Sequence, residues 1–186
     1  MALYEVDGFV PEIGSGTYVC DSASVIGNVK IGSNCFVAPG ARLRGDYGRI
    51  EIGEGTSVED NCVIHARPGE TTRVGSHVTL GHSCVLHNCT VEDYAVIGAG
   101  AIVSDWAVVG QWTVVAEGAL VRNGFEVPAG MIAVGVPAKL LDKMVSEGYK
   151  NDWLHFKGIY ERLASDVYPR TFREVPWKFK PGTGSR

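Results

Sequence analysis

Apolar residues recur every six positions along most of this chain, and this period limits the possible folds more than any other feature. The marks are Val19, Val25, Ile31, Val37, Leu43, Ile52, Val58, Ile64, Val74, Leu80, Leu86, Val91, Ile97, Val103, Val109, Val115, Val121 and Val127. The residue four places after a mark is usually small, as at Ala23 and Cys35. An amphipathic α-helix would repeat its apolar residues every three to four positions. A period of six instead predicts an all-β solenoid, the parallel β-helix of hexapeptide repeats.

The repeat also divides the chain into segments. Residues 1–16 precede it and are expected to form a lead-in that caps the solenoid. Residues 17–135 form the predicted β-helix, which should be left-handed as in the hexapeptide solenoids that this pattern resembles. For residues 136–165 we expect C-terminal α-helices, a short one over 138–145 after Pro137 and a second over 151–164. The tail, 166–186, should be extended.

Insertions in the repeat fix which side chains stack. In left-handed hexapeptide solenoids three hexads make one coil of about eighteen residues, and residues one coil apart lie roughly 4.8 Å apart. Once the insertions are subtracted, Arg44, His65 and His87 stack on one edge, and Asp60 and His82 stack on a neighbouring edge. One chain cannot easily bring the two ladders together, whereas a three-fold oligomer can. It would place His82 of one chain against His65 and His87 of the next, and Arg44 against Asp60.

Three converging imidazoles are the ligand set of a catalytic zinc site with an open fourth position. The sequence therefore predicts a metal held by His65, His82 and His87. We expect Zn²⁺, although imidazole also suits Fe²⁺ and Co²⁺. Solvated or hydrogen-bonded surface histidines are the alternative. His77 has the wrong phase in the repeat, and His155 lies in the C-terminal region, so neither is expected to be a ligand.

Several segments of the chain resemble the γ-class carbonic anhydrase family. These are Arg44-Gly45-Asp46, Val58-Glu59-Asp60-Asn61, His65, Gly81-His82 and His87. The resemblance is closest to the subgroup that resembles proteins of phenylacetate and carnitine metabolism. It implies a homotrimer with three metal sites at subunit interfaces. It also implies an interface ion-pair group formed by Arg44, Asp46 and Asp60, in which Arg44 pairs with Asp60.

The same resemblance suggests further site residues. Glu59 matches the position that hydrogen-bonds the metal hydroxide, Ser57 matches a polar neighbour, and Tyr160 is a candidate for a helix tyrosine that approaches the site. Purely structural roles are the alternative for each. The chain departs from the founding archaeal enzyme of the γ-class family at Tyr47, where that enzyme has Glu. It also lacks the long acidic loop of the proton shuttle, and Glu70 is the sole carboxylate in its shorter loop.

Composition excludes several other functions. The chain has 186 residues and a net charge of −4, and it carries no basic stripe or aromatic platform that would indicate nucleic-acid binding. Its start lacks a signal peptide, and no apolar run approaches a membrane span, so the cytoplasm is the expected compartment. The five cysteines should be free thiols. Cys62 and Cys84 should stack in the core, and Cys89 should lie in the core or a turn.

Three functions fit these observations. The first is a carbonic anhydrase-like lyase in which metal hydroxide attacks CO₂ to give bicarbonate, or attacks the carbonyl of an acyl-CoA thioester as a thioesterase would. The second is a hexapeptide-repeat acyltransferase, in which one histidine acts as general base. The third is a non-catalytic trimeric scaffold. The three-histidine pattern favours the first, since a transferase needs no converging histidines.

Overall fold

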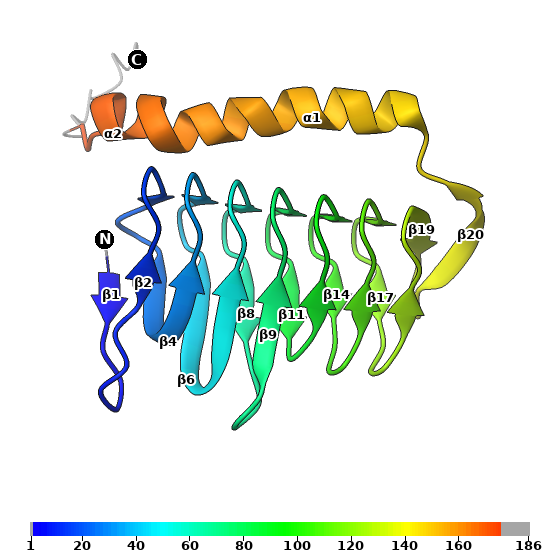
Figure 1. The fold of residues 1–186 in the computed structure, drawn as a ribbon, viewed down its shortest axis with the longest axis horizontal. Helices are drawn as coiled ribbons and strands as arrows, with labels where there is room; N and C mark the ends of the chain where they lie inside the picture. Colours follow the sequence, from blue (N-terminus) through cyan, green and yellow to red (C-terminus); the bar gives the residue numbers. More distant parts are fainter. Residues whose placement is uncertain (1, 176–186) are drawn as a thin grey trace, which may run out of the picture.

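The computed structural model describes residues 2–175 and forms a parallel β-helix, whose successive coils stand side by side along one axis (Figure 1). The strands pair in parallel with the strands one coil before and after them, and they build three faces. The predicted fold class is therefore confirmed. The regular spacing of the coils follows from the hexad, which brings an apolar residue inward at each strand.

The first face contains the first part of the long strand β6 and the strands that stack before and after it, coil by coil. In order these are β1 (Ala2–Tyr4), β4 (Ser24–Ile31), β6 (Arg42–Ile52), β8 (Val63–His65), β11 (Val85–His87), β14 (Ile102–Val103) and β17 (Leu120–Val121). The second face contains the later parts of β4 and β6 with β2 (Glu12–Ile13), β9 (Thr71–Val74), β12 (Thr90–Val91), β15 (Val108–Val109) and β18 (Glu126–Val127). The third face is β3 (Tyr18–Val19), β5 (Phe36–Val37), β7 (Ser57–Val58), β10 (Thr79–Leu80), β13 (Val96–Ile97), β16 (Val114–Val115), β19 (Met131–Val134) and β20 (Lys139–Met144).

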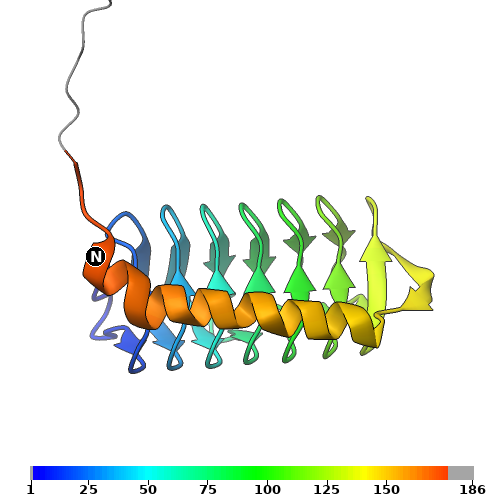
Figure 2. The same ribbon diagram turned by 90° about the horizontal axis from the view of Figure 1, so that it is seen from above.

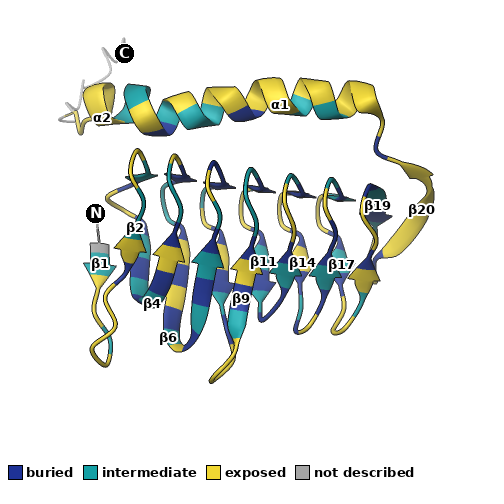
Figure 3. Cartoon of the chain, viewed as in Figure 1, coloured by how far each residue is buried: buried dark blue, intermediate teal, exposed yellow. Residues whose placement is uncertain are grey.

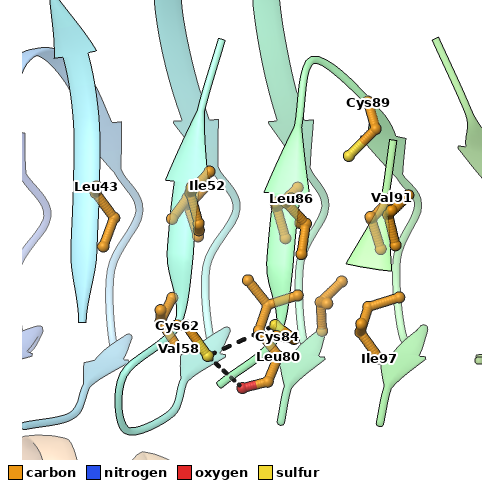
Figure 4. Packing of buried hydrophobic residues seen from close by; sticks show 14 of the residues in the cluster. Leu43, Ile52, Val58, Cys62, Leu80, Cys84, Leu86, Cys89, Val91 and Ile97 are labelled. Carbon is orange, nitrogen blue, oxygen red and sulfur yellow. Dashed lines mark hydrogen bonds between the residues drawn. The ribbon is translucent and has the colours of Figure 1, made fainter. Parts of the chain in front are cut away.

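The apolar marks of the repeat fill the interior. Leu43, Ile64 and Leu86 are fully buried and stack from coil to coil, as their strand register requires. Figure 4 shows part of this interior, with Cys62 and Cys84 close to Val58 and Leu80. The Sγ atoms of these two cysteines lie 3.5 Å apart, which confirms the predicted stack. All five cysteines are free and buried, so they serve as compact core side chains.

Tight turns join the strands, and one corner of the triangle uses the left-handed backbone region. His77, Tyr94 and Trp112 adopt positive φ there (54°, 59° and 58°), which is unusual for bulky residues. Their rings stack along the axis, with centroids 5.0 and 4.6 Å apart. Close approach of coils at the same corner requires glycine, because a Cβ on Gly32 would lie 2.7 Å from the backbone nitrogen of Glu54.

The segment after the β-helix differs from the expectation. A short helix over 138–145 was predicted, but residues 139–144 form β20, which pairs antiparallel with β19. Pairing supplies hydrogen-bond partners for the free edge of the last strand, and this outweighs the local helix pattern. The backbone nitrogens of Ala138 and Val145 donate to the Leu120 and Gly130 carbonyls and fix the ends of this segment.

Helix α1 (Glu147–Arg162) then runs back along the coils, as Figure 2 shows from above. It agrees with the helix predicted for 151–164, begins four residues earlier, and is capped by the Ser146 side chain. Its outer side is exposed (Figure 3). Lys150 places its ammonium 5.5 Å from the Trp112 ring, and His77 pairs with Glu161, so the aromatic corner helps to hold the helix.

The expectation of an extended tail from residue 166 is wrong for its first part. A π-helical turn, η1 (Leu163–Val167), and the short helix α2 (Tyr168–Thr171) continue α1. Tyr168 packs its ring against Phe36 and Tyr18, which anchors this segment to the first coils. The remainder of the tail, 176–186, lies outside the described residues. None of the described helices combines the length and the apolar character that a bilayer-spanning helix needs.

Candidate metal centre

The first histidine ladder lies on three paired strands, with His65 and His87 at the ends of β8 and β11. Arg44 in β6 pairs with His65 in β8, and His65 pairs with His87 in β11. This register confirms the stack predicted from the spacing and the insertions. The three side chains therefore project from one edge of the β-helix.

The two imidazoles of this ladder face each other through one nitrogen each. Nδ1 of His65 lies 3.2 Å from Nε2 of His87, and the ring centroids are 5.2 Å apart. Two nitrogens bound to one tetrahedral zinc at about 2.0–2.1 Å would lie about 3.3 Å apart. The same distance lets one neutral ring donate a hydrogen bond to the other. The separation of the two nitrogens thus matches that of two ligands of one zinc ion.

The outer nitrogens of both rings are held by carboxylates. Nε2 of His65 lies 3.0 Å from Oδ1 of Asp46, and Nδ1 of His87 contacts Oδ1 of Asp105. Metal-binding histidines usually have such a partner, which fixes the tautomer and aims the free nitrogen. Desolvation raises the pKa of Asp46, but hydrogen bonds from Arg44 and His65 outweigh it, so this pKa lies below its usual value. Asp46 is therefore poised to stay ionised beside His65.

Arg44 and Asp46, which the sequence places in an ion-pair group between subunits, form an ion pair inside one chain. Asp46 thus bridges Arg44 and His65. The pairing of Arg44 with Asp60 across an interface stays a prediction.

Asp105 was missed in the sequence. Strands β11 and β14 are in register at seventeen residues (Leu86 with Val103), so the repeat places Ser104 rather than Asp105 one coil beyond His87, although the Asp105 carboxylate contacts Nδ1 of that histidine. The second carboxylate oxygen of Asp105 pairs with Nε of Arg67 at 3.3 Å, and the Arg67 guanidinium lies 4.9 Å from the Trp106 ring. These contacts hold the carboxylate in place beside the histidine.

Glu70, the only carboxylate of the short loop, is already engaged. It accepts hydrogen bonds from the Asn88 amide at 2.6 Å and from the Trp106 indole at 3.0 Å. A carboxylate held by two donors is less free to swing and carry protons than a solvated one. The loop therefore offers a poor replacement for a mobile proton shuttle.

His82 lies on another edge, between two carboxylates of its own chain. Its Nδ1 is 2.9 Å from Oδ2 of Asp60, and its Nε2 is 2.9 Å from Oε2 of Glu59. The predicted stack of His82 on Asp60 is thus confirmed. One candidate ligand atom from each of these three residues lies within 4.8 Å of the others. His82 itself is exposed, and this leaves it accessible to a neighbouring molecule.

Glu59 is buried at 4 % relative exposure, and Tyr160 of α1 meets it. Burial raises the pKa of Glu59, while His82 and a hydrogen bond from Tyr160 oppose that effect. Burial and the nearby Glu59 charge raise the pKa of Tyr160 to about 12. The phenol therefore stays protonated at neutral pH and donates to the carboxylate. The structure brings Tyr160, the candidate on the helix, together with Glu59 and His82.

Ser57 is buried on the same face, but its partner is a residue that sequence reasoning missed. The Lys157 ammonium donates to Ser57 Oγ at 2.9 Å, to the Val78 carbonyl at 2.7 Å and to Thr79 Oγ1 at 3.2 Å. Burial lowers the pKa of Lys157 to about 8. In the sequence, the one sign that Lys157 points toward the β-helix is its position about one helical turn before Tyr160. The contact between Ser57 on β7 and Lys157 on α1 thus helps to hold the helix against the third face.

Two histidines lie apart from both ladders. His77 contacts Glu161 and Tyr94, and His155 lies beside Phe156. Within the described chain, the ligand atoms of His65, His82 and His87 do not meet in one group. One chain therefore presents two separate histidine groups, the His65–His87 pair on one edge and His82 on another.

Comparison with known proteins agrees with this architecture. The sequence model of the bacterial transferase hexapeptide family (six repeats) matches residues 11–45. The chain is 40% identical to gamma carbonic anhydrase 2, mitochondrial, of Arabidopsis thaliana over 143 residues, which cover 74% of this chain and 51% of that protein. It is 32% identical to the carnitine operon protein CaiE of Escherichia coli O157:H7 over 170 residues, covering 91% of this chain and 84% of CaiE.

Two solved structures share the fold over most of their length. A hexapeptide transferase family protein from Anaplasma phagocytophilum has a TM-score of 0.83 at 37% identity, with 88% of this chain and 96% of that chain covered. A putative acetyltransferase from Bacillus cereus has a TM-score of 0.86 at 27% identity, with 90% and 97% covered.

The fold and the edge that carries His65 and His87 together define a hexapeptide-repeat β-helix protein, in which a carboxylate contacts each of the two paired histidines. The chain belongs to the γ-carbonic anhydrase-like family of hexapeptide-repeat proteins, as the match along most of CaiE indicates. It spans about half the length of the plant carbonic anhydrases that it matches.

Proposed function

We propose that this protein is a metal-dependent enzyme of the γ-carbonic anhydrase type that interconverts CO₂ and bicarbonate. The observation that carries the proposal is the facing pair of His65 and His87 nitrogens, 3.2 Å apart, with a carboxylate behind each ring. Ordinary surface histidines have no need for such a preorganised pair. Two relatives named gamma carbonic anhydrases support the same activity.

The two histidine groups, taken as two half-sites, support a shared centre in a homotrimer. His65 and His87 of one subunit would hold the metal together with His82 of the next, which gives three sites at three interfaces. Asp60 would keep its bond to Nδ1 of His82, while Nε2 turns from Glu59 toward the metal. Neutral imidazoles suit Zn²⁺ and also Fe²⁺ and Co²⁺.

The metal, when bound, supplies Lewis-acid activation of water near neutral pH. The chain supplies position and hydrogen bonds. Asp46 and Asp105 hold the two rings, and Glu59, which contacts Nε2 of His82, would accept a hydrogen bond from the reacting water. Tyr160 donates to Glu59 and limits its orientations. Because Glu70 is tied to Asn88 and Trp106, proton export should limit turnover.

The same activated water can attack a larger carbonyl carbon, so an acyl-CoA thioester is the alternative substrate. An acyltransferase is the second candidate, and the likeness to a hexapeptide transferase family protein and a putative acetyltransferase favours it. Metal dependence separates the two reactions, since a transferase that uses one histidine as general base needs no metal.

The test pairs metal analysis with stopped-flow CO₂ hydration on anaerobically purified protein. We expect about one metal per chain, with hydration lost on chelation and regained with metal. His87→Ala should lose metal and activity, whereas the matched variant His77→Ala should keep both, because His77 lies outside the half-sites. Absence of metal after reconstitution with Zn²⁺, Co²⁺ and Fe²⁺ would contradict the proposal. Metal without hydration would direct the search to acyl thioesters.

A further inference from the structure

The outer side of the first face carries a stripe of apolar side chains. In each coil the residue before the inward-pointing mark points outward, and on this face four such residues are in register. They are Val63, Val85, Ile102 and Leu120. Val63 and Ile102 are 40% and 41% exposed. At the same position of the repeat the second face carries charged side chains, those of Lys30, Glu51 and Arg73. Aligned apolar side chains in this exposed position indicate a surface that another molecule covers.

The two histidine groups border this stripe. His65 and His87 are the last residues of two of its strands, and His82 lies in the turn that leads into β11. The face and its two edges therefore form one continuous surface. We take its occupants to be two further copies of this chain, which rests on the shared metal centre proposed above. Only another copy brings a His82 edge against an edge with His65 and His87.

Each edge carries one further charged residue beyond its histidine. Strands β11, β14 and β17 are in register, so Arg122, directly after β17, lies two coils beyond His87. Strands β10, β13 and β16 are in register, so Glu117, two residues after β16, lies two coils beyond His82. Both side chains are exposed, and neither makes a hydrogen bond or an ion pair with the described residues 2–175. An unpartnered cation and an unpartnered anion thus lie on the two edges that the shared centre brings together.

The two charges stand at matching heights in the proposed trimer. The ladders of neighbouring subunits rise in the same direction, and a metal held by His65 and His87 lies halfway between their coils. His82 of the next subunit is therefore half a coil below His87. Glu117 and Arg122 are each two coils further along, so Glu117 of that subunit is also half a coil below Arg122, about 2.4 Å. An arginine and a glutamate side chain are each at least as long as that of histidine, so together they can span the same gap.

We propose that Arg122 of one subunit and Glu117 of the next form an ion pair that sets the height of one subunit against the other. The apolar stripe alone does not set it, because similar side chains repeat in every coil. A slide of one coil would place Ala99 or Gly135 opposite Arg122, and neither carries a charge. Ion pairs contribute little to the stability of an exposed interface, but they discriminate between registers. The pair therefore holds His82 at the height of the metal.

The experiment measures trimer dissociation of the full chain by fluorescence-detected sedimentation velocity over a dilution series. Arg122→Glu and Glu117→Arg each replace three attractions per trimer by three repulsions. Each should raise the concentration at half-dissociation about tenfold. Combining the two substitutions in one chain reverses every pair and should bring the value back to within about twofold of the wild type. Glu126→Arg is the matched control, because it makes the same charge change on an exposed residue of the second face and should have no effect.

Arg122→Gln removes the charge without adding a repulsion and should raise the same concentration about threefold, which keeps the test open if a reversed chain fails to fold. Single variants that dissociate like the wild type would overturn the pair. A double variant that dissociates as readily as the single variants would also overturn it. A wild-type chain that stays monomeric at every concentration would contradict the shared centre as well as the pair. A wild-type trimer with bound metal and unaffected variants would overturn the pair alone.

Discussion

Replacing Asp105 by Asn tests whether the carboxylates behind the histidines serve a metal. The substitution keeps the size of the side chain but removes the charge that Nδ1 of His87 contacts. Asp105 exposes only 12% of its side chain, so solvent screens this interaction little. Loss of such an outer-shell partner typically lowers metal affinity about 10–100-fold, which corresponds to about 1.4–2.7 kcal/mol. We expect a decrease in that range.

The assay is competition for Zn²⁺ against a chromophoric chelator of known affinity, at fixed pH and salt. Asp93→Asn is the control, because Asp93 accepts a hydrogen bond from the Ser76 backbone and an amide oxygen can do the same. Thermal unfolding of the metal-free proteins shows whether either substitution disturbs the fold. If Asp105→Asn folds normally and keeps its zinc affinity within about twofold of the wild type, the proposed role of Asp105 is wrong.

Three further predictions follow from burial and charge. Ile64→Ala should destabilise the β-helix by about 2–5 kcal/mol in urea unfolding, since Ile64 is fully buried, whereas Val63→Ala, at 40% exposure, should change stability far less. The pKa of Lys157 is about 8 in the folded chain and 10.5 for an ordinary lysine, which stands for the unfolded chain. The unfolded chain therefore binds more protons between these two pH values. Stability should therefore rise from pH 8 to 10.5, by on the order of 3 kcal/mol, and a Lys157→Met chain without that rise would support the assignment. Tyr160→Phe should slow CO₂ hydration without releasing metal, and unchanged kinetics would show that its bond to Glu59 has no catalytic role.

The stacking of the site residues was predictable because the β-helix turns sequence spacing directly into position. Once the insertions were subtracted, the pairs Arg44–His65, His65–His87 and Asp60–His82 followed by arithmetic. Asp105 does not follow this rule, because the register of β11 and β14 places Ser104 one coil beyond His87, and only the three-dimensional structure brings the Asp105 carboxylate to that histidine.

Contacts between the helix and the coils could not be derived in this way. Nothing in the hexad pattern places Lys157 on Ser57 or leaves the Trp153 indole without a partner, because both depend on the rotation of α1 about its axis. The strand at Lys139–Met144 was also missed, since its conformation is set by the free edge of β19 rather than by local propensity. The β-helix could thus be predicted from the six-residue period alone, whereas the contacts of α1 with it depend on the tertiary structure.

The central claim is a metal site shared between subunits, and metal content of mixed trimers tests it most directly. His82→Ala and His65→Ala chains should each bind no metal alone. After co-refolding in equal amounts, a site is complete where a chain that keeps His65 precedes a chain that keeps His82, which gives about one site in four. Recovery of that fraction of metal, with hydration activity, is the predicted result. No recovery in trimers shown to contain both chains would contradict the shared centre.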